Sequence, residues 1–330
     1  MIYAFGAFGT NNIGDEAILA GMRSVYNGVK AVYVNKLTDV DSIYMGDFPP
    51  LKQPPFPIDC TEIIIGGGGL LYTEQVLQYY VDLLRLAKAY GVPASIQRIG
   101  AEGIVDCNIQ KLGLVVDMCK LATSISVRSH KSKEILSKYT VKPIKVEPDF
   151  AYSLYKENLP QYEYYKEERI PRIGVVLNGM ASITPELLKV IRECTIKSPL
   201  AYFHFIPHSR PYVSINNNDV IAQEHLWSSI DIYHANREQR IVLHQFSPFP
   251  MHAVNLYQAM DGIIGLRYHS FIFSELTQKP LISYASGVKF QSYFLETKRT
   301  DATYLDPTNK TLVYQGLMNF ITRIALDKSL

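Results

Sequence analysis

The sequence predicts an α/β protein with two Rossmann-like domains that face each other across a cleft. Short β-rich runs alternate with helical patterns along the whole chain, an arrangement that builds parallel sheets covered by helices. About ten such runs occur, which is more than one ordinary sheet holds. Residues 152–171, rich in charge, tyrosine and proline, interrupt the alternation and are predicted to link domains at 1–151 and 172–330.

Each predicted strand is a short apolar run that ends near Gly, Asn or Ser. In chain order, the runs lie within residues 1–8, 29–36, 62–69, 93–100, 124–130, 172–179, 200–207, 240–246, 262–269 and 279–286. Between them, residues 75–91 have apolar positions at i, i+3, i+4 and i+7, and Gly91 stands where a helix would end. A last helix is expected over residues 311–326 and is expected to pack back on the first domain.

Composition narrows the class of protein. The 330 residues carry a formal charge of +2, so the chain lacks the broad positive field that nucleic-acid binding needs. No stretch of ~18 uninterrupted apolar residues and no secretory signal pattern occurs, which predicts a cytoplasmic protein with no transmembrane segment; peripheral membrane association stays open. Cys60, Cys107, Cys119 and Cys194 form no CxxC pair, so no metal site is expected.

Polar residues cluster at four predicted strand ends of the first domain. In "AFGTNNIGDEAIL", Asn12 and Gly14 precede Asp15 and Glu16 at a helix start. Asp15 is either an N-cap or part of a polar mouth for an anion or a sugar hydroxyl, and the stretch matches neither common nucleotide motif. In "IIIGGGGLLY", the glycines allow close approach of a ligand or of a neighbouring loop. Gly67 and Gly68 of this stretch are candidate binding residues. The other two strand ends, "SIQRIGAEG" and "SISVRSHKSKEIL", contribute Arg98 and Arg128 as candidates.

The second domain supplies cations at two strand ends. "FHFIPHSRP" contains His208 and Arg210, and "GIIGLRYHSFIFSEL" places Arg267 and His269 between a buried strand and a helix. A cation beside a helix N-terminus is mildly unfavourable. A bound anion would remove this conflict, so we interpret this turn as an anion site.

The chain resembles the polysaccharide pyruvyltransferase family, because several motifs of that family occur in it in the same order. They are "NIGDEAIL", "IIGGGGLL", "VRSHKSKEIL", "PDFAYSL" and "GLRYHSFIFSELTQKPLISY" followed by Lys289, and they span nearly the whole chain. Arg98 and Ala101 stand where family members often have Gly and Pro, and Ser129 replaces an acidic residue.

The resemblance implies a GT-B-like fold and transfer of the enolpyruvyl unit of phosphoenolpyruvate to a sugar as a pyruvate ketal, with no cofactor and no metal. Arg267, His269, His208, Arg210 and Lys289 would bind the donor from the second domain, because arginine suits carboxylate and phosphate groups. His269 would be the general acid, and Arg267 would stabilise the leaving phosphate.

The first domain would form the acceptor side, where Asp15 or Glu16 would take the proton from the sugar hydroxyl. The acceptor is a saccharide, and lipid-linked and nucleotide-linked forms are both open. Two alternatives remain at this point. One is a GT-B glycosyltransferase that uses a nucleotide sugar, and the other is a non-catalytic saccharide-binding relative.

Overall fold

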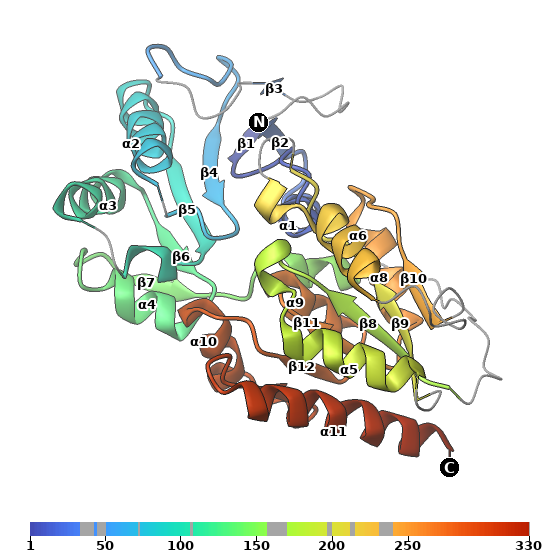
Figure 1. Cartoon of the computed structure of the whole chain (residues 1–330). Coiled ribbons are helices and arrows are strands. Elements are labelled where there is room, and N and C mark those ends of the chain that lie inside the picture. Colours follow the sequence, from blue (N-terminus) through green and yellow to red (C-terminus); the bar gives the residue numbers. More distant parts are fainter. Residues whose placement is uncertain are drawn as a thin grey trace. The chain divides into compact units, whose positions relative to one another are not determined.

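The computed structural model describes residues 1–33, 43–44, 51–71, 73–105, 108–156, 170–196, 200–211, 215–230 and 240–329. The chain forms two compact units (Figure 1). The first comprises residues 1–10 and 14–156, and the second comprises residues 11–13 and 157–330. This division falls within the predicted linker, of which residues 157–169 lie outside the described residues.

The first unit is built on a parallel sheet of seven strands in the order β3-β2-β1-β4-β5-β6-β7. The strands are β1 (Ile2–Phe5), β2 (Lys30–Tyr33), β3 (Ile43–Tyr44), β4 (Glu62–Gly66), β5 (Ala94–Ile99), β6 (Ile125–Val127) and β7 (Ile144–Val146). The helices are α1 (Ile13–Val25), α2 (Glu74–Ala89), α3 (Ile109–Leu121), α4 (His130–Leu136) and the 3-10 turns η1 (Glu102–Ile104) and η2 (Phe150–Lys156). The strand order reverses between β1 and β4, the point at which such sheets bind ligands.

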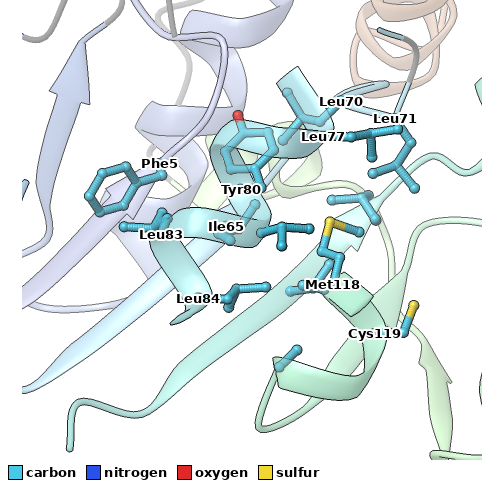
Figure 2. Packing of buried hydrophobic residues seen from close by; sticks show 14 of the residues in the cluster. Phe5, Ile65, Leu70, Leu71, Leu77, Tyr80, Leu83, Leu84, Met118 and Cys119 are labelled. Atoms are coloured by element: carbon cyan, nitrogen blue, oxygen red, sulfur yellow. The ribbon is translucent and has the colours of Figure 1, made fainter. Parts of the chain in front are cut away.

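Strand β4 is buried on both faces of this sheet. Ile63 and Ile65 contribute to one apolar cluster, whereas Ile64 belongs to a second cluster that includes Ile18 and Met22 of α1. Figure 2 shows the first cluster, in which Ile65 lies among side chains of α2 and α3, including Leu77, Tyr80, Leu83, Leu84 and Met118. Each fully buried aliphatic side chain contributes about 1.5–3 kcal/mol. Burial on both faces explains why this strand reads as a continuous apolar run.

Helix α2 begins and ends as its sequence predicts. The Thr73 hydroxyl accepts a hydrogen bond from the Val76 amide at 3.2 Å. At the other end Gly91 has φ 70°, and the Val92 amide donates to the Ala87 carbonyl at 2.9 Å. A residue with a side chain is strained at such a φ, so the glycine ends the helix.

The second unit contains a parallel sheet of six strands in the order β10-β9-β8-β11-β12-β13. The strands are β8 (Arg172–Val176), β9 (Tyr202–Phe205), β10 (Ile241–Leu243), β11 (Gly262–Gly265), β12 (Leu281–Ser283) and β13 (Ala302–Tyr304). The helical elements are η3 (Met180–Ser182), α5 (Pro185–Ile196), η4 (Ile215–Asn217), α6 (Asp219–Ser229), α8 (Pro250–Gln258), α9 (Tyr268–Leu276), α10 (Val288–Glu296) and α11 (Lys310–Ser329). Here the order reverses between β8 and β11.

The C-terminal helix α11 lies along the second unit and covers β11 and α5 (Figure 1). Gly262 of β11 leaves room for this contact, since a Cβ there would come within 2.2 Å of Ile324 and 3.0 Å of Phe320. The Cys194 Sγ of α5 lies 3.8 Å from the Met318 Sδ of α11. Packing of this helix against the first unit stays a prediction.

All ten predicted runs contain a strand, and two parallel sheets with helices confirm the predicted α/β class with two Rossmann-like halves. Strands β3, β7 and β13 were not predicted. β3 has only two residues, and β7 and β13 are edge strands with at most one buried residue each, so none of the three shows an apolar run. Among the described residues, no helix is long and apolar enough to span a membrane.

Candidate functional site

A buried carboxylate joins three strand-end loops of the second unit. Asp219 is the first residue of α6, and its side chain is 1% exposed. Its Oδ1 accepts the Gly179 amide at 2.9 Å, from the loop after β8. Its Oδ2 accepts the amides of His208 and Ser209 at 3.0 Å each, from the loop after β9. Asp219 therefore fixes the positions of both loops.

The third loop reaches Asp219 through Arg267, which is the N-cap residue of α9. The Arg267 Nε and Nη2 donate to the two carboxylate oxygens of Asp219 at 2.7 Å each, and Nη2 also donates to the Asn217 carbonyl at 2.7 Å. This internal ion pair compensates the guanidinium charge beside the helix start. The expectation that a bound anion is needed for that compensation is therefore wrong.

Arg267 is nevertheless held in a position that leaves one guanidinium nitrogen available to an anion. Its side chain is 14% exposed, and within the described part of the chain its Nη1 makes no hydrogen bond. Arg267 provides no side-chain cap for α9. An arginine fixed along one edge loses little further freedom when it binds a ligand with the other nitrogen.

The two predicted histidines lie close to the Asp219–Arg267 pair in the structure or in the chain. His269, in the first turn of α9, is 8% exposed, and its ring lies edge-on to Tyr268 at 5.7 Å between centroids. His208 is 1% exposed, its Nε2 lies 3.0 Å from the Tyr257 hydroxyl, and its ring contacts Phe273.

His208 does not provide positive charge at neutral pH. Burial lowers its pKa well below the usual value, and the charges of Arg267 and His269 lower it further. Any part that His208 plays in donor binding is therefore expected to use the neutral ring, and that role stays a prediction.

Arg210 and Lys289 are exposed cations of the second unit. The Arg210 amide donates to the Asn11 carbonyl at 2.9 Å, Asn12 forms an isolated β-bridge with Ser209, and the Ile13 amide donates to the His208 carbonyl at 2.8 Å. Asn12 thus lies beside the loop that carries Arg210. Lys289, near the start of α10, has its Nζ 4.9 Å from the Phe290 ring centroid.

In the first unit, the glycine tract packs on α1. Gly67 has φ 81°, and a Cβ there would lie 2.0 Å from the Ile18 Cγ2. Gly68 has φ 71°, and its Cβ would lie 3.1 Å from the Asp15 Oδ1. Of the two interpretations, close packing of a neighbouring element accounts for Gly67, so substitution there should affect folding and activity alike. Gly68 is adjacent to a carboxylate proposed for function.

Asp15 and Glu16 lie in the first turn of α1, with Gly14 buried before them. The helix begins at Ile13, so Asp15 is not its N-cap. The Glu16 Oε1 accepts the Gly9 amide at 2.7 Å. Burial raises the pKa of Glu16 to about 7, and the Asp15 charge adds to the rise, while the Gly9 amide and Arg23 oppose it.

Arg98 and Arg128 make internal contacts. Arg128 pairs with Asp149 at 3.1 Å, and the two side chains are 3% and 1% exposed. Arg98 has φ 52°, and its guanidinium lies 4.2 Å from the Phe150 ring centroid. A glycine would be unstrained at such a φ, so this backbone conformation suits glycine better than arginine. A direct contact of either arginine with substrate stays a prediction.

Sequence reasoning missed Asp219. Its only local signal is the polar stretch before α6, where the Asn218 side chain caps the helix. That pattern predicts a helix start, but it cannot show that the next carboxylate binds an arginine 48 residues later in the chain. Within the described residues, no group of three or more His, Cys, Asp or Glu side chains could hold a metal ion.

Comparison with solved structures places the chain among two-domain proteins of the GT-B fold. It aligns with a putative UDP-N-acetylglucosamine 2-epimerase from Listeria monocytogenes at 10% identity and TM-score 0.64, covering 99% of this chain and 89% of that one. MnaA from S. aureus, solved with UDP, gives 11% identity and TM-score 0.63, with 99% and 90% covered. Anabaena Alr3699/HepE, solved with UDP, aligns at 11% identity and TM-score 0.61, and the alignment covers 99% of this chain and 95% of that one.

At these identities the likeness shows the fold alone. A profile of the polysaccharide pyruvyl transferase family matches residues 12–287, and the chain belongs to that family. No curated protein sequence matches it.

Proposed function

We propose that the protein transfers the enolpyruvyl unit of phosphoenolpyruvate to a sugar of a glycan or glycan precursor and forms a pyruvate ketal. Family membership supports the class of reaction. The observation that carries the proposal is the fixed guanidinium at the start of α9, which Asp219 holds along one edge. Phosphoenolpyruvate has a carboxylate and a phosphate, and both are groups that arginine and helix amides bind.

His269 donates a proton to the terminal carbon of the enol, and a sugar hydroxyl oxygen bonds to the carbon next to the carboxylate. The bond from that carbon to the phosphate oxygen then breaks, and the phosphate leaves with the electron pair while Arg267 stabilises its charge. A second hydroxyl of the same sugar adds to this carbon and closes the ring. One hydroxyl proton goes to the enzyme base and the other to the phosphate.

Glu16 is the better candidate for that base. A general base works best when its pKa lies near the working pH, and the pKa of Glu16 is raised to about 7. Asp15 contributes to this rise through its charge. Loss of Glu16 should therefore lower turnover and remove a limb of the pH profile near neutrality.

The proposal is tested by phosphate release from phosphoenolpyruvate with a pool of glycan acceptors, and by mass spectrometry of the pyruvylated product. His269→Ala should keep donor binding and lower turnover by about 10² to 10⁴, the usual contribution of a general acid. His225→Ala, on the exposed part of α6, is the matched control. Full turnover in His269→Ala would place the proton donor elsewhere.

Donor binding is measured separately, as protection of the protein from thermal unfolding. Arg267→Lys keeps the charge but loses the planar fork, so protection by phosphoenolpyruvate should weaken about tenfold to a hundredfold. Arg323→Lys on α11 is the control. Protection by UDP-sugars and not by phosphoenolpyruvate would instead favour a nucleotide-sugar transferase. Saccharide binding without protection by either donor would indicate a non-catalytic relative.

A further inference from the structure

A pocket of the second unit lies beside the Arg267 turn and is not used by the steps above. It has a volume of about 160 Å³, and its lining comes from residues after β8, β11 and β12 and from the start of α5. Leu266, the residue before Arg267, forms part of its lining. Strand β8 meets β11 at the reversal of the strand order, where open α/β sheets bind ligands.

The walls of this pocket are held by internal hydrogen bonds. The Ser182 hydroxyl accepts the Asn178 amide of the main chain at 2.9 Å and donates to the Gly179 carbonyl at 2.7 Å. The Thr184 hydroxyl accepts the Leu187 amide at 3.2 Å, at the start of α5. The Tyr284 hydroxyl donates to the Ser182 carbonyl at 3.0 Å. The lining is therefore preorganised and does not need a ligand to take its shape.

Three polar side chains of the lining are left for a ligand. They are the amide of Asn178, the carboxylate of Glu186 and the hydroxyl of Ser286. Within the described part of the chain, none of these three groups forms a hydrogen bond or an ion pair. They come from three separate elements, namely the loop after β8, the first turn of α5 and the loop after β12. Polar groups that converge on one small space set the orientation of a ligand.

The chemistry of the lining selects the class of ligand. None of the described residues that line the pocket is a lysine or an arginine, and Glu186 would repel an anion. The remaining lining includes Leu266, Ala285, Pro307 and Val313, which can contact the C–H groups of a ring. An entirely apolar ligand would cover the half-buried side chains of Asn178 and Glu186 without giving them a hydrogen-bond partner. A neutral molecule with several hydroxyl groups fits both the polar groups and the apolar residues of this lining.

The volume limits the occupant to about one ring, since a cavity of about 150 Å³ accepts a single benzene ring. We propose that this pocket binds one neutral sugar ring, whose hydroxyl groups are recognised by Asn178, Glu186 and Ser286. Identification of that ring with part of the glycan acceptor rests on the proposed function. Glu186 is then a specificity-determining residue, because its carboxylate can accept hydrogen bonds from two adjacent hydroxyls.

The test uses saturation-transfer NMR on the full chain, without phosphoenolpyruvate. The probes are the methyl glycosides of glucose, galactose, mannose and N-acetylglucosamine, with glucose 6-phosphate as the anionic counterpart. We expect saturation transfer to at least one methyl glycoside and weaker transfer to the phosphate. Glu186→Gln should weaken binding about tenfold, and Asn178→Ala should act in the same direction.

Two further variants keep the test sharp. Ala181→Trp, at an exposed position of the rim, fills the pocket and should abolish transfer. Glu224→Gln, an exposed glutamate of α6, is the matched control and should bind like the wild-type protein. Lack of transfer to any methyl glycoside would overturn the inference, and so would transfer that is unchanged in Glu186→Gln and Ala181→Trp.

These outcomes are separable from those that test the proposed function. Phosphate release from phosphoenolpyruvate without glycoside binding in this pocket would remove the inference and leave the function standing. Glycoside binding that Glu186→Gln weakens, in a protein that does not turn over phosphoenolpyruvate, would support the pocket and remove the function.

Discussion

Asp219→Asn is a sharp perturbation of the site because it changes one atom of a buried group. The carboxylate accepts hydrogen bonds on both oxygens. Oδ1 accepts from Gly179 and Arg267, and Oδ2 accepts from His208, Ser209 and Arg267. An asparagine amide must put its NH₂ group against one of these two sets of donors, whichever way it is turned.

The cost follows from the donors that lose their acceptor. If the NH₂ group replaces Oδ1, two donors lose their acceptor, namely the Gly179 amide and the Arg267 Nη2. Each buried donor without a partner costs about 1–3 kcal/mol, and removal of one partner of a buried ion pair costs about 3–5 kcal/mol. We therefore expect a loss of about 3–5 kcal/mol, and the unfolding temperature should fall by about 10 °C or more.

Differential scanning calorimetry of the full chain is the suitable assay, since two units can unfold in separate transitions. Asp327→Asn, at an exposed position of α11, makes the same chemical change outside the site and should unfold like the wild-type protein. Asp219→Asn should also weaken protection by phosphoenolpyruvate, because Arg267 loses its fixed edge. An unfolding temperature within about 2 °C of the control, which corresponds to less than about 1 kcal/mol, would refute the reasoning.

Three more predictions concern the first unit. Gly67→Ala should destabilise the protein by at least about 2 kcal/mol in thermal unfolding, because φ 81° and the 2.0 Å approach to Ile18 both oppose a Cβ; Gly69→Ala, which meets no atom within 4 Å, should be neutral. Arg98→Gly should be more stable than Arg98→Ala by about 1 kcal/mol, the reverse of the usual order, because φ is 52°; equal stability would show that the strain is absent. For Glu16 the folded pKa is raised from 4.5 to about 7, so the folded state binds more protons and stability should fall as pH rises from about 5 to 7. The free energy of unfolding, measured by urea denaturation, should fall by about 3 kcal/mol over this pH range. Glu16→Gln should not show this fall.

Particular elements show how far sequence patterns reach. The apolar run before Gly66 predicts a strand, and the structure confirms it, with the isoleucines buried on both faces. Gly91 was predicted to end a helix, and its φ of 70° confirms that. The strand and the helix end both depend on residues that are adjacent in the chain, so a local sequence pattern can predict them. The two-residue strand Ile43–Tyr44 has no such pattern and was missed.

The sequence by itself determined the α/β class, the ten main strands and the turn that carries Arg267 and His269, since these follow from local periodicity and from the order of motifs. Tertiary structure alone decided what those side chains contact. It paired Arg267 with Asp219, enclosed His208 so that it stays neutral, and turned Gly67 toward Ile18. These contacts join residues far apart in the chain, and their electrostatics depend on burial, which a single sequence does not record.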